Sequence, residues 1–173
     1  MAMSLQHVLE ARRRIQGFIH TTPVMQSLHL NERTGSDLFF KCEHLQKTGA
    51  FKARGAANAV FALSDEKAKT GVATHSSGNH GAALARAAQL RGIPAWIVVP
   101  ENALSSKKAA IRHYGAEIIE CAPTLDARES SLAALVKDKQ CQVVPPYDDA
   151  LVIAGQGTAC LLYTSDAADE LRS

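Results

Sequence analysis

Apolar positions from residue 71 onward fall into short runs separated by longer stretches with helical spacing. The pattern predicts strands over 71–74, 95–99, 117–121 and 141–144, and helices over 78–90, 104–113 and 125–137. Strands and helices that alternate at these lengths indicate βαβ crossovers, so we expect an α/β fold with a parallel twisted sheet and helices on both faces. Ligand sites in such sheets lie beyond the carboxyl ends of strands, here at 76–81 and 145–149.

Other patterns flank this alternating region. They predict an amphipathic helix from Leu5 that ends near residues 17–20, a short helix over 27–33, a strand over 37–43 and an Ala-rich helix over 51–63. Residues 150–158 begin a further helix, although Gly155 and Gly157 are unfavourable there unless another group must approach closely.

The first candidate for chemistry is Lys52, within the string T-G-A-F-K-A-R-G-A. Thr48 and Gly49 can cap and turn a helix start, which places Lys52 in the first helical turn. The helix dipole disfavours an ammonium charge there, and a neutral lysine amine is a nucleophile that can form a Schiff base. On the local pattern alone, a solvated helix lysine is the more common case.

A second candidate is the string S-S-G-N-H-G at 76–81, between a predicted strand and a predicted helix. Small and hydroxylic residues at such a turn expose backbone N–H groups, which form an anion site together with the helix dipole. From the residues alone, Ser77 is also an N-cap candidate and Asn79 a turn former. Neither G-x-G-x-x-G nor G-x-x-x-x-G-K occurs, so no nucleotide-binding signature is present.

Together, these two strings resemble the fold type II pyridoxal-phosphate enzymes, specifically the branch of serine/threonine dehydratases and serine racemase. The resemblance runs from about residue 5 to residue 158 and implies a truncated fold of the tryptophan synthase β type. Residues 1–70 would be the N-terminal part of the large cofactor domain and 71–148 the small α/β domain. Residues 149–159 would return into the incomplete large domain.

The resemblance implies that pyridoxal 5'-phosphate is held by Lys52, Phe51 and Asn79. Lys52 would form the Schiff base and remove the substrate α-proton, Phe51 would pack on the cofactor ring, and Asn79 would bond the ring 3-oxygen. Without the resemblance, Phe51 is equally well explained as a core aromatic residue.

It also implies a substrate carboxylate site made by Ser76, Ser77, Asn79 and His80, mainly through backbone N–H groups. In racemase-like members, the serine at position 77 faces the α-carbon from the side opposite the lysine and returns a proton there. Arg128 matches an arginine near the substrate carboxylate, although an exposed helical arginine is the simpler interpretation of the sequence.

The implied activity is that of a serine/threonine dehydratase, an ammonia-lyase that gives a 2-oxo acid and ammonia. Serine racemase is the alternative, because both reactions begin with loss of the α-proton. P-P-Y-D-D at 145–149 is dehydratase-like, whereas S-S-G-N-H-G and L-F-F-K-C-E are racemase-like. A non-catalytic α/β binding module is the alternative from another class.

The end of the chain departs from the family. Residues 160–170, C-L-L-Y-T-S-D-A-A-D-E, resemble translated read-through of a transposon-based sequencing adapter, so 160–173 are predicted to be a non-native tail; a polar helix terminus over 166–171 is the alternative. The family continues for about as many residues again. We therefore expect an inactive N-terminal fragment, without the phosphate cradle, the ring-nitrogen partner and any divalent-cation site of racemase-like members.

Composition adds little to this picture. The net charge is +2, the basic residues are scattered apart from 12–14 and 107–108, and the aromatic content of 5% is not interleaved with them, so nucleic-acid binding has little support. No apolar run could span a membrane, no histidine pair has metal-ligand spacing, and the cysteines lack C-x-x-C spacing. We expect buried reduced thiols, a cytoplasmic location, a small amino-acid substrate and, by the resemblance, a homo-oligomer at full length.

Overall fold

The computed structural model describes residues 3–170, and the side chains of residues 3–161. Its centre is a parallel sheet in the order β5-β4-β3-β6, made by β3 (Val72–His75), β4 (Ala95–Pro100), β5 (Glu117–Cys121) and β6 (Gln142–Val143). Each strand begins and ends within one residue of its predicted range. The predicted parallel α/β architecture is confirmed.

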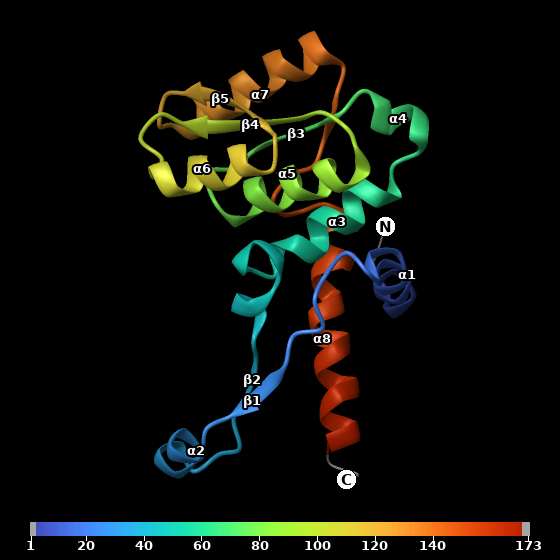
Figure 1. The fold of residues 1–173 in the computed structure, drawn as a ribbon, viewed down its shortest axis with the longest axis vertical. Coiled ribbons are helices and arrows are strands. Elements are labelled where there is room, and N and C mark those ends of the chain that lie inside the picture. Colours follow the sequence, from blue (N-terminus) through green and yellow to red (C-terminus); the bar gives the residue numbers. More distant parts are fainter. Residues whose placement is uncertain (1–2, 171–173) are drawn as a thin grey trace.

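Helices cover both faces of this sheet, as Figure 1 shows. Helices α5 (Asn79–Arg91) and α6 (Ser105–His113) lie on one face, and α7 (Leu125–Lys139) lies on the other. Successive strand residues point to opposite faces, so both sets of side chains must be apolar. On one side Val72, Ile97 and Val99 pack with α5 and α6, and on the other Ala73 and Val98 pack with α7.

Helix α3 (Lys52–Ala62) joins the sheet region to the rest of the molecule. It packs against α5 on one side and against α8 (Ala150–Glu170) on the other, and α1 (Leu5–Ile15) contacts both α3 and α8. All residues from Ala53 to Val60 are buried, which the small side chains of this helix permit. A Cβ on Gly155 of α8 would lie 2.6 Å from Gly55 Cα, so the close approach predicted at the α8 glycines is confirmed.

An arm extends away from this body in Figure 1. Its antiparallel strands β1 (Val24–Gln26) and β2 (Phe39–Lys41) flank α2 (Leu28–Thr34). The strand predicted over 37–43 is therefore shorter, because the chain turns into the 3-10 helices η1 (Glu43–Leu45) and η2 (Lys47–Gly49). Strand β1 and the short helix α4 (Asp65–Lys69) were not predicted.

Helix α8 runs through the boundary predicted at residue 160 and ends at Glu170. Residues 171–173 of the predicted tail lie outside the described residues, and the assignment of 160–173 as non-native stays a prediction. Two of the cysteines expected to be buried are so, Cys42 and Cys141, whereas Cys160 is exposed. Among the described residues, no helix is long and apolar enough to cross a membrane, and no cluster of His, Cys, Asp and Glu could hold a metal ion.

Candidate active site

Lys52 is the first residue of α3, so its predicted place in the first helical turn is confirmed. The predicted cap is wrong, because Phe51 holds the N-cap position and no side chain caps the helix. Thr48 instead has φ 60° inside η2, and its hydroxyl is buried without a partner among the described residues. Gly49, with φ 71°, supplies the turn that precedes the helix.

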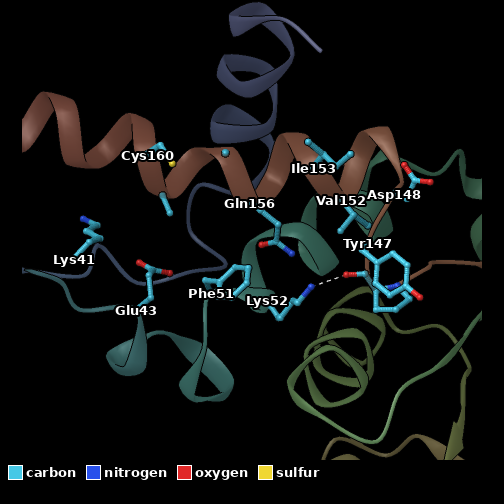
Figure 2. Close-up of a pocket in the computed structure, with 13 residues that line it drawn as sticks. Lys41, Glu43, Phe51, Lys52, Tyr147, Asp148, Val152, Ile153, Gln156 and Cys160 are labelled. Carbon is cyan, nitrogen blue, oxygen red and sulfur yellow. Dashed lines mark hydrogen bonds between the residues drawn. The ribbon is translucent and has the colours of Figure 1, made fainter. Parts of the chain in front are cut away.

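The Lys52 amine lies in a partly desolvated place. Its Nζ donates a hydrogen bond to Pro146 O at 2.5 Å, dashed in Figure 2, and lies 5.3 Å from the centroid of the Phe51 ring. Burial lowers the pKa of Lys52 below its ordinary value. A larger share of neutral amine is what a Schiff-base lysine requires.

A cavity of about 720 Å³ opens beside this amine. Figure 2 shows its walls: the start of α3, the segment after β6, the segment before η1 and one side of α8. Its lining includes Glu43, Phe51, Lys52, Pro146, Tyr147, Val152 and Gln156.

The order of the strands explains why the site is here. The chain passes from β3 outward to β4 and β5, then returns to place β6 on the other side of β3. Such a reversal opens a crevice at the carboxyl ends of the two strands, where α/β proteins bind ligands. The loop at 76–78 leaves β3 at this point, and the segment 144–149 leaves β6 beside it.

The segment after β6 contacts both predicted motifs. Lys52 donates to Pro146 O, and His80 Nε2 donates to Val144 O at 3.0 Å. Lys52 and His80, which are far apart in the sequence, are thus hydrogen-bonded to the carbonyl groups of two residues that are almost adjacent in the chain. We call residues 144–149 the crossover segment.

His80 is 2% exposed, and burial lowers its pKa to about 4. The charges of Lys52 and His75 act in the same direction, while the bond to Val144 and the charge of Asp149 oppose it. The imidazole is therefore neutral near pH 7. Because Nε2 donates to a carbonyl oxygen, Nδ1 carries no proton, and it has no partner among the described residues.

The start of α5 keeps its backbone donors free. Gly78 is the N-cap and no side chain caps the helix, so the interpretation of Ser77 as a capping residue is wrong. Ser76 Oγ accepts the Gly78 N–H at 3.3 Å. The N–H groups of Asn79, His80 and Gly81 have no intrahelical acceptor in the first turn, which suits an anion.

The structure does not bring every predicted site residue to the cavity. Phe51 and Lys52 line it, whereas the 76–80 loop residues do not, although His80 reaches the crossover segment. Arg128 lies on α7, across the sheet from α3, and its Nε donates to Thr124 O at 3.2 Å. The roles assigned to Ser76, Ser77, Asn79, His80 and Arg128 stay predictions.

A buried ion pair behind Lys52 was not predicted. Arg54 is fully buried, and its Nε and a terminal nitrogen donate to the two oxygens of Glu43 at 2.8 and 2.7 Å. Burial alone would raise the pKa of Glu43, but the hydrogen bonds from Arg54 and Thr22 and the Arg54 charge outweigh it, and the pKa is lowered. The sequence marks Arg54 by its place after Lys52 and gives no signal for its partner.

These groups fit an aldehyde cofactor at Lys52 and a separate anionic ligand group at the start of α5. The lysine has a lowered pKa, the cavity is large enough for a small molecule, an aromatic ring stands beside the amine, and a helix start offers free donors.

Comparison with known proteins agrees with this geometry. The sequence profile of the pyridoxal-phosphate dependent enzymes, PALP, matches residues 15–162. The chain belongs to the PALP family. Its described fold is thus that of a PALP protein, and the resemblance seen in the two sequence strings is confirmed.

Among its relatives, a serine racemase of Dictyostelium discoideum is 50% identical over 92% of this chain and 49% of the relative. A beta-hydroxyaspartate dehydratase of Paracoccus denitrificans is 51% identical over 88% of this chain and 49% of the relative. The solved structure of a threonine deaminase from T.th. has a TM-score of 0.90 and 43% identity, over 96% of this chain and 53% of its own. The PALP chain described here spans about half the length of the curated relatives it matches.

Proposed function

We propose that the protein carrying this chain is a pyridoxal-phosphate-dependent dehydratase of a small hydroxy amino acid, serine or threonine. The observation that carries the proposal is the Lys52 amine, partly desolvated at the wall of the cavity beside the strand-order reversal. The dehydratase and deaminase among the relatives support it.

Each residue has a defined task in this proposal. Lys52 holds the cofactor and then takes the α-proton at Nζ; Phe51 and Asn79 hold the cofactor ring. The free N–H groups at the start of α5 bind the substrate carboxylate, with Ser76 and His80 shaping that turn. Bound pyridoxal phosphate supplies the electron sink that stabilises the charge left when the α-proton departs. The β-hydroxyl then leaves with a proton as water, and hydrolysis of the unsaturated product by another water gives the 2-oxo acid and ammonia.

Serine racemase is the second candidate, and Ser77 is the observation that favours it. The hydroxyl of Ser77 caps no helix, so it is available to return a proton to the α-carbon from the side opposite Lys52. The serine racemases among the relatives support this candidate. The same proposal includes a cytoplasmic location, a homo-oligomeric state and a divalent cation bound outside this chain. It also includes a part for Arg128 in binding the substrate carboxylate.

The first test is borohydride reduction of the full-length protein with pyridoxal phosphate, followed by peptide mapping. We expect the reduced cofactor on Lys52, and an unlabelled protein for Lys52→Ala. Lys47→Ala, a lysine substitution in η2, is the matched control and keeps the label. A label spread over several lysines, or none, would refute the assignment and favour a binding module.

A second test separates the two activities. Full-length protein with L-serine or L-threonine should release ammonia and a 2-oxo acid, and chiral analysis should reveal any D-serine. Ser77→Ala should suppress formation of D-serine and retain the release of ammonia. If D-serine is the main product and ammonia is negligible, the racemase assignment replaces the dehydratase.

A further inference from the structure

The glycine-flanked Gln156 of α8 contacts the helix turn that carries Lys52. Gln156 Oε1 accepts the Gly55 N–H at 3.1 Å, and the same side chain lines the cavity beside the Lys52 amine. Figure 2 shows the Gln156 side chain extending from α8 toward α3. Gln156 has no role in the proposed function or in the family resemblance described above.

This hydrogen bond completes an irregular first turn. Ala53 N–H donates to Ala50 O at 3.3 Å and Arg54 N–H donates to Phe51 O at 3.0 Å, a tight spacing of three residues. The carbonyl that Gly55 would use in a regular α-helix, that of Phe51, is thus taken by Arg54. Gln156 supplies the missing acceptor from another helix.

Two glycines make the contact possible. A Cβ on Gly55 would overlap the Gln156 amide and would lie 2.8 Å from Val152 O. A Cβ on Gly155 would lie 2.7 Å from Arg54 O. Any side chain at either position would push α8 and its glutamine away from the first turn of α3.

We propose that Gln156 is a positioning residue, which fixes the first turn of α3 and so holds the Lys52 amine against the crossover segment. The inference rests on the proposed function only in giving Lys52 its chemical task. Without the acceptor, the Gly55 N–H would have no hydrogen-bond partner in this turn, the first turn of α3 would loosen, and the amine would gain freedom to reach water.

The test follows the Lys52 amine itself in the full-length protein freed of pyridoxal phosphate. Acetic anhydride labelling over a pH series, read by mass spectrometry, gives the pH midpoint of amine reactivity, and hydrogen exchange reports the Gly55 N–H. Gln156→Met keeps side-chain length and removes the acceptor. We expect the midpoint to rise toward that of an ordinary lysine, with slower labelling near pH 8 and faster exchange at Gly55.

Asn58→Leu is the matched control, because Asn58 Nδ2 donates to Leu151 O at 2.7 Å and ties the same two helices farther from Lys52. Asn58→Leu should lower the free energy of unfolding and leave the pH midpoint of Lys52 labelling unchanged. Gln156→Glu retains an acceptor and should restore slow exchange at Gly55. Equal midpoints for Gln156→Met and the parent protein, or equal shifts for Gln156→Met and Asn58→Leu, would overturn the inference.

The two proposals fail in different ways. If borohydride reduction places no cofactor on Lys52, the proposed function fails whatever the Gln156 variants do. If the cofactor attaches normally and the Gln156→Met midpoint is unmoved, only the positioning role fails.

Discussion

The close approach of α3 and α8 predicts a strong asymmetry between two glycines of the same helix. In Gly155→Ala, the new Cβ would meet backbone atoms, Gly55 Cα at 2.6 Å and Arg54 O at 2.7 Å. Ordinary van der Waals contact begins near 3.4 Å, so the two helices must separate by about 0.8 Å at this point. Neither neighbour is a flexible side chain that could rotate away.

The expected cost follows from two opposing terms. Overpacking in a rigid core lowers the free energy of unfolding by about 3 kcal/mol at the upper end of its usual range. Replacing a helical glycine by alanine raises the free energy of unfolding by about 1 kcal/mol. Gly155→Ala should therefore lower the free energy of unfolding by about 2 kcal/mol. With a typical dependence of stability on urea, the unfolding midpoint falls by about 1 M.

Gly157→Ala is the matched control in α8. Its Cβ would meet only the Val8 side chain, at 3.1 Å, and Val8 is half-buried and able to shift. Its stability should stay within about 1 kcal/mol of the parent protein. Urea unfolding of the full-length protein and both variants decides the matter, and equal midpoints for the two variants would refute the reasoning.

Three further outcomes can be measured by the same method. Glu43→Ala leaves the buried Arg54 guanidinium unpaired and should cost about 3 kcal/mol, part of which a second change, Arg54→Met, should recover. The folded protein keeps His80 neutral down to about pH 4, whereas the unfolded chain takes up a proton near pH 6.5. Stability should therefore fall by up to about 3 kcal/mol between pH 6.5 and 4, and an equally steep fall in His80→Gln would contradict this. Thr124→Ala removes the acceptor of the Ala127 N–H at the start of α7 and should cost about 1 kcal/mol; an unchanged midpoint would mean that the cap is replaced by water.

Much of the sheet region could be predicted from the sequence because its signals are local. Strands buried on both faces are short apolar runs, and the glycines after α5 and α6, Gly92 and Gly115, have the positive φ that ends a helix. The order of the strands carries no such local signal. The return of β6 to the side of β3 is decided by packing between residues distant in the chain.

The candidate site could be predicted only where a side chain, rather than a backbone group, forms the contact. Lys52 could be recognised by its residue type and neighbours, and the glycines around Gln156 indicated a close contact without saying to what. The carbonyl groups of Val144 and Pro146, which hold His80 and Lys52, are present at every residue and give no signal. Thr48 was wrongly expected to cap α3, because it lies in η2 with a left-handed φ of 60° and Phe51 takes the N-cap position.

The bond between Lys52 and Pro146 joins residues 94 positions apart, and this separation makes the site a late product of folding. Closing so long a loop is entropically unfavourable until the intervening strands and helices have formed and shortened it. During synthesis, the lysine emerges from the ribosome long before the carbonyl that receives it. A chain whose sheet has not closed therefore presents only an ordinary solvated amine, and a partly desolvated Lys52 amine marks a chain in which β6 has joined the sheet.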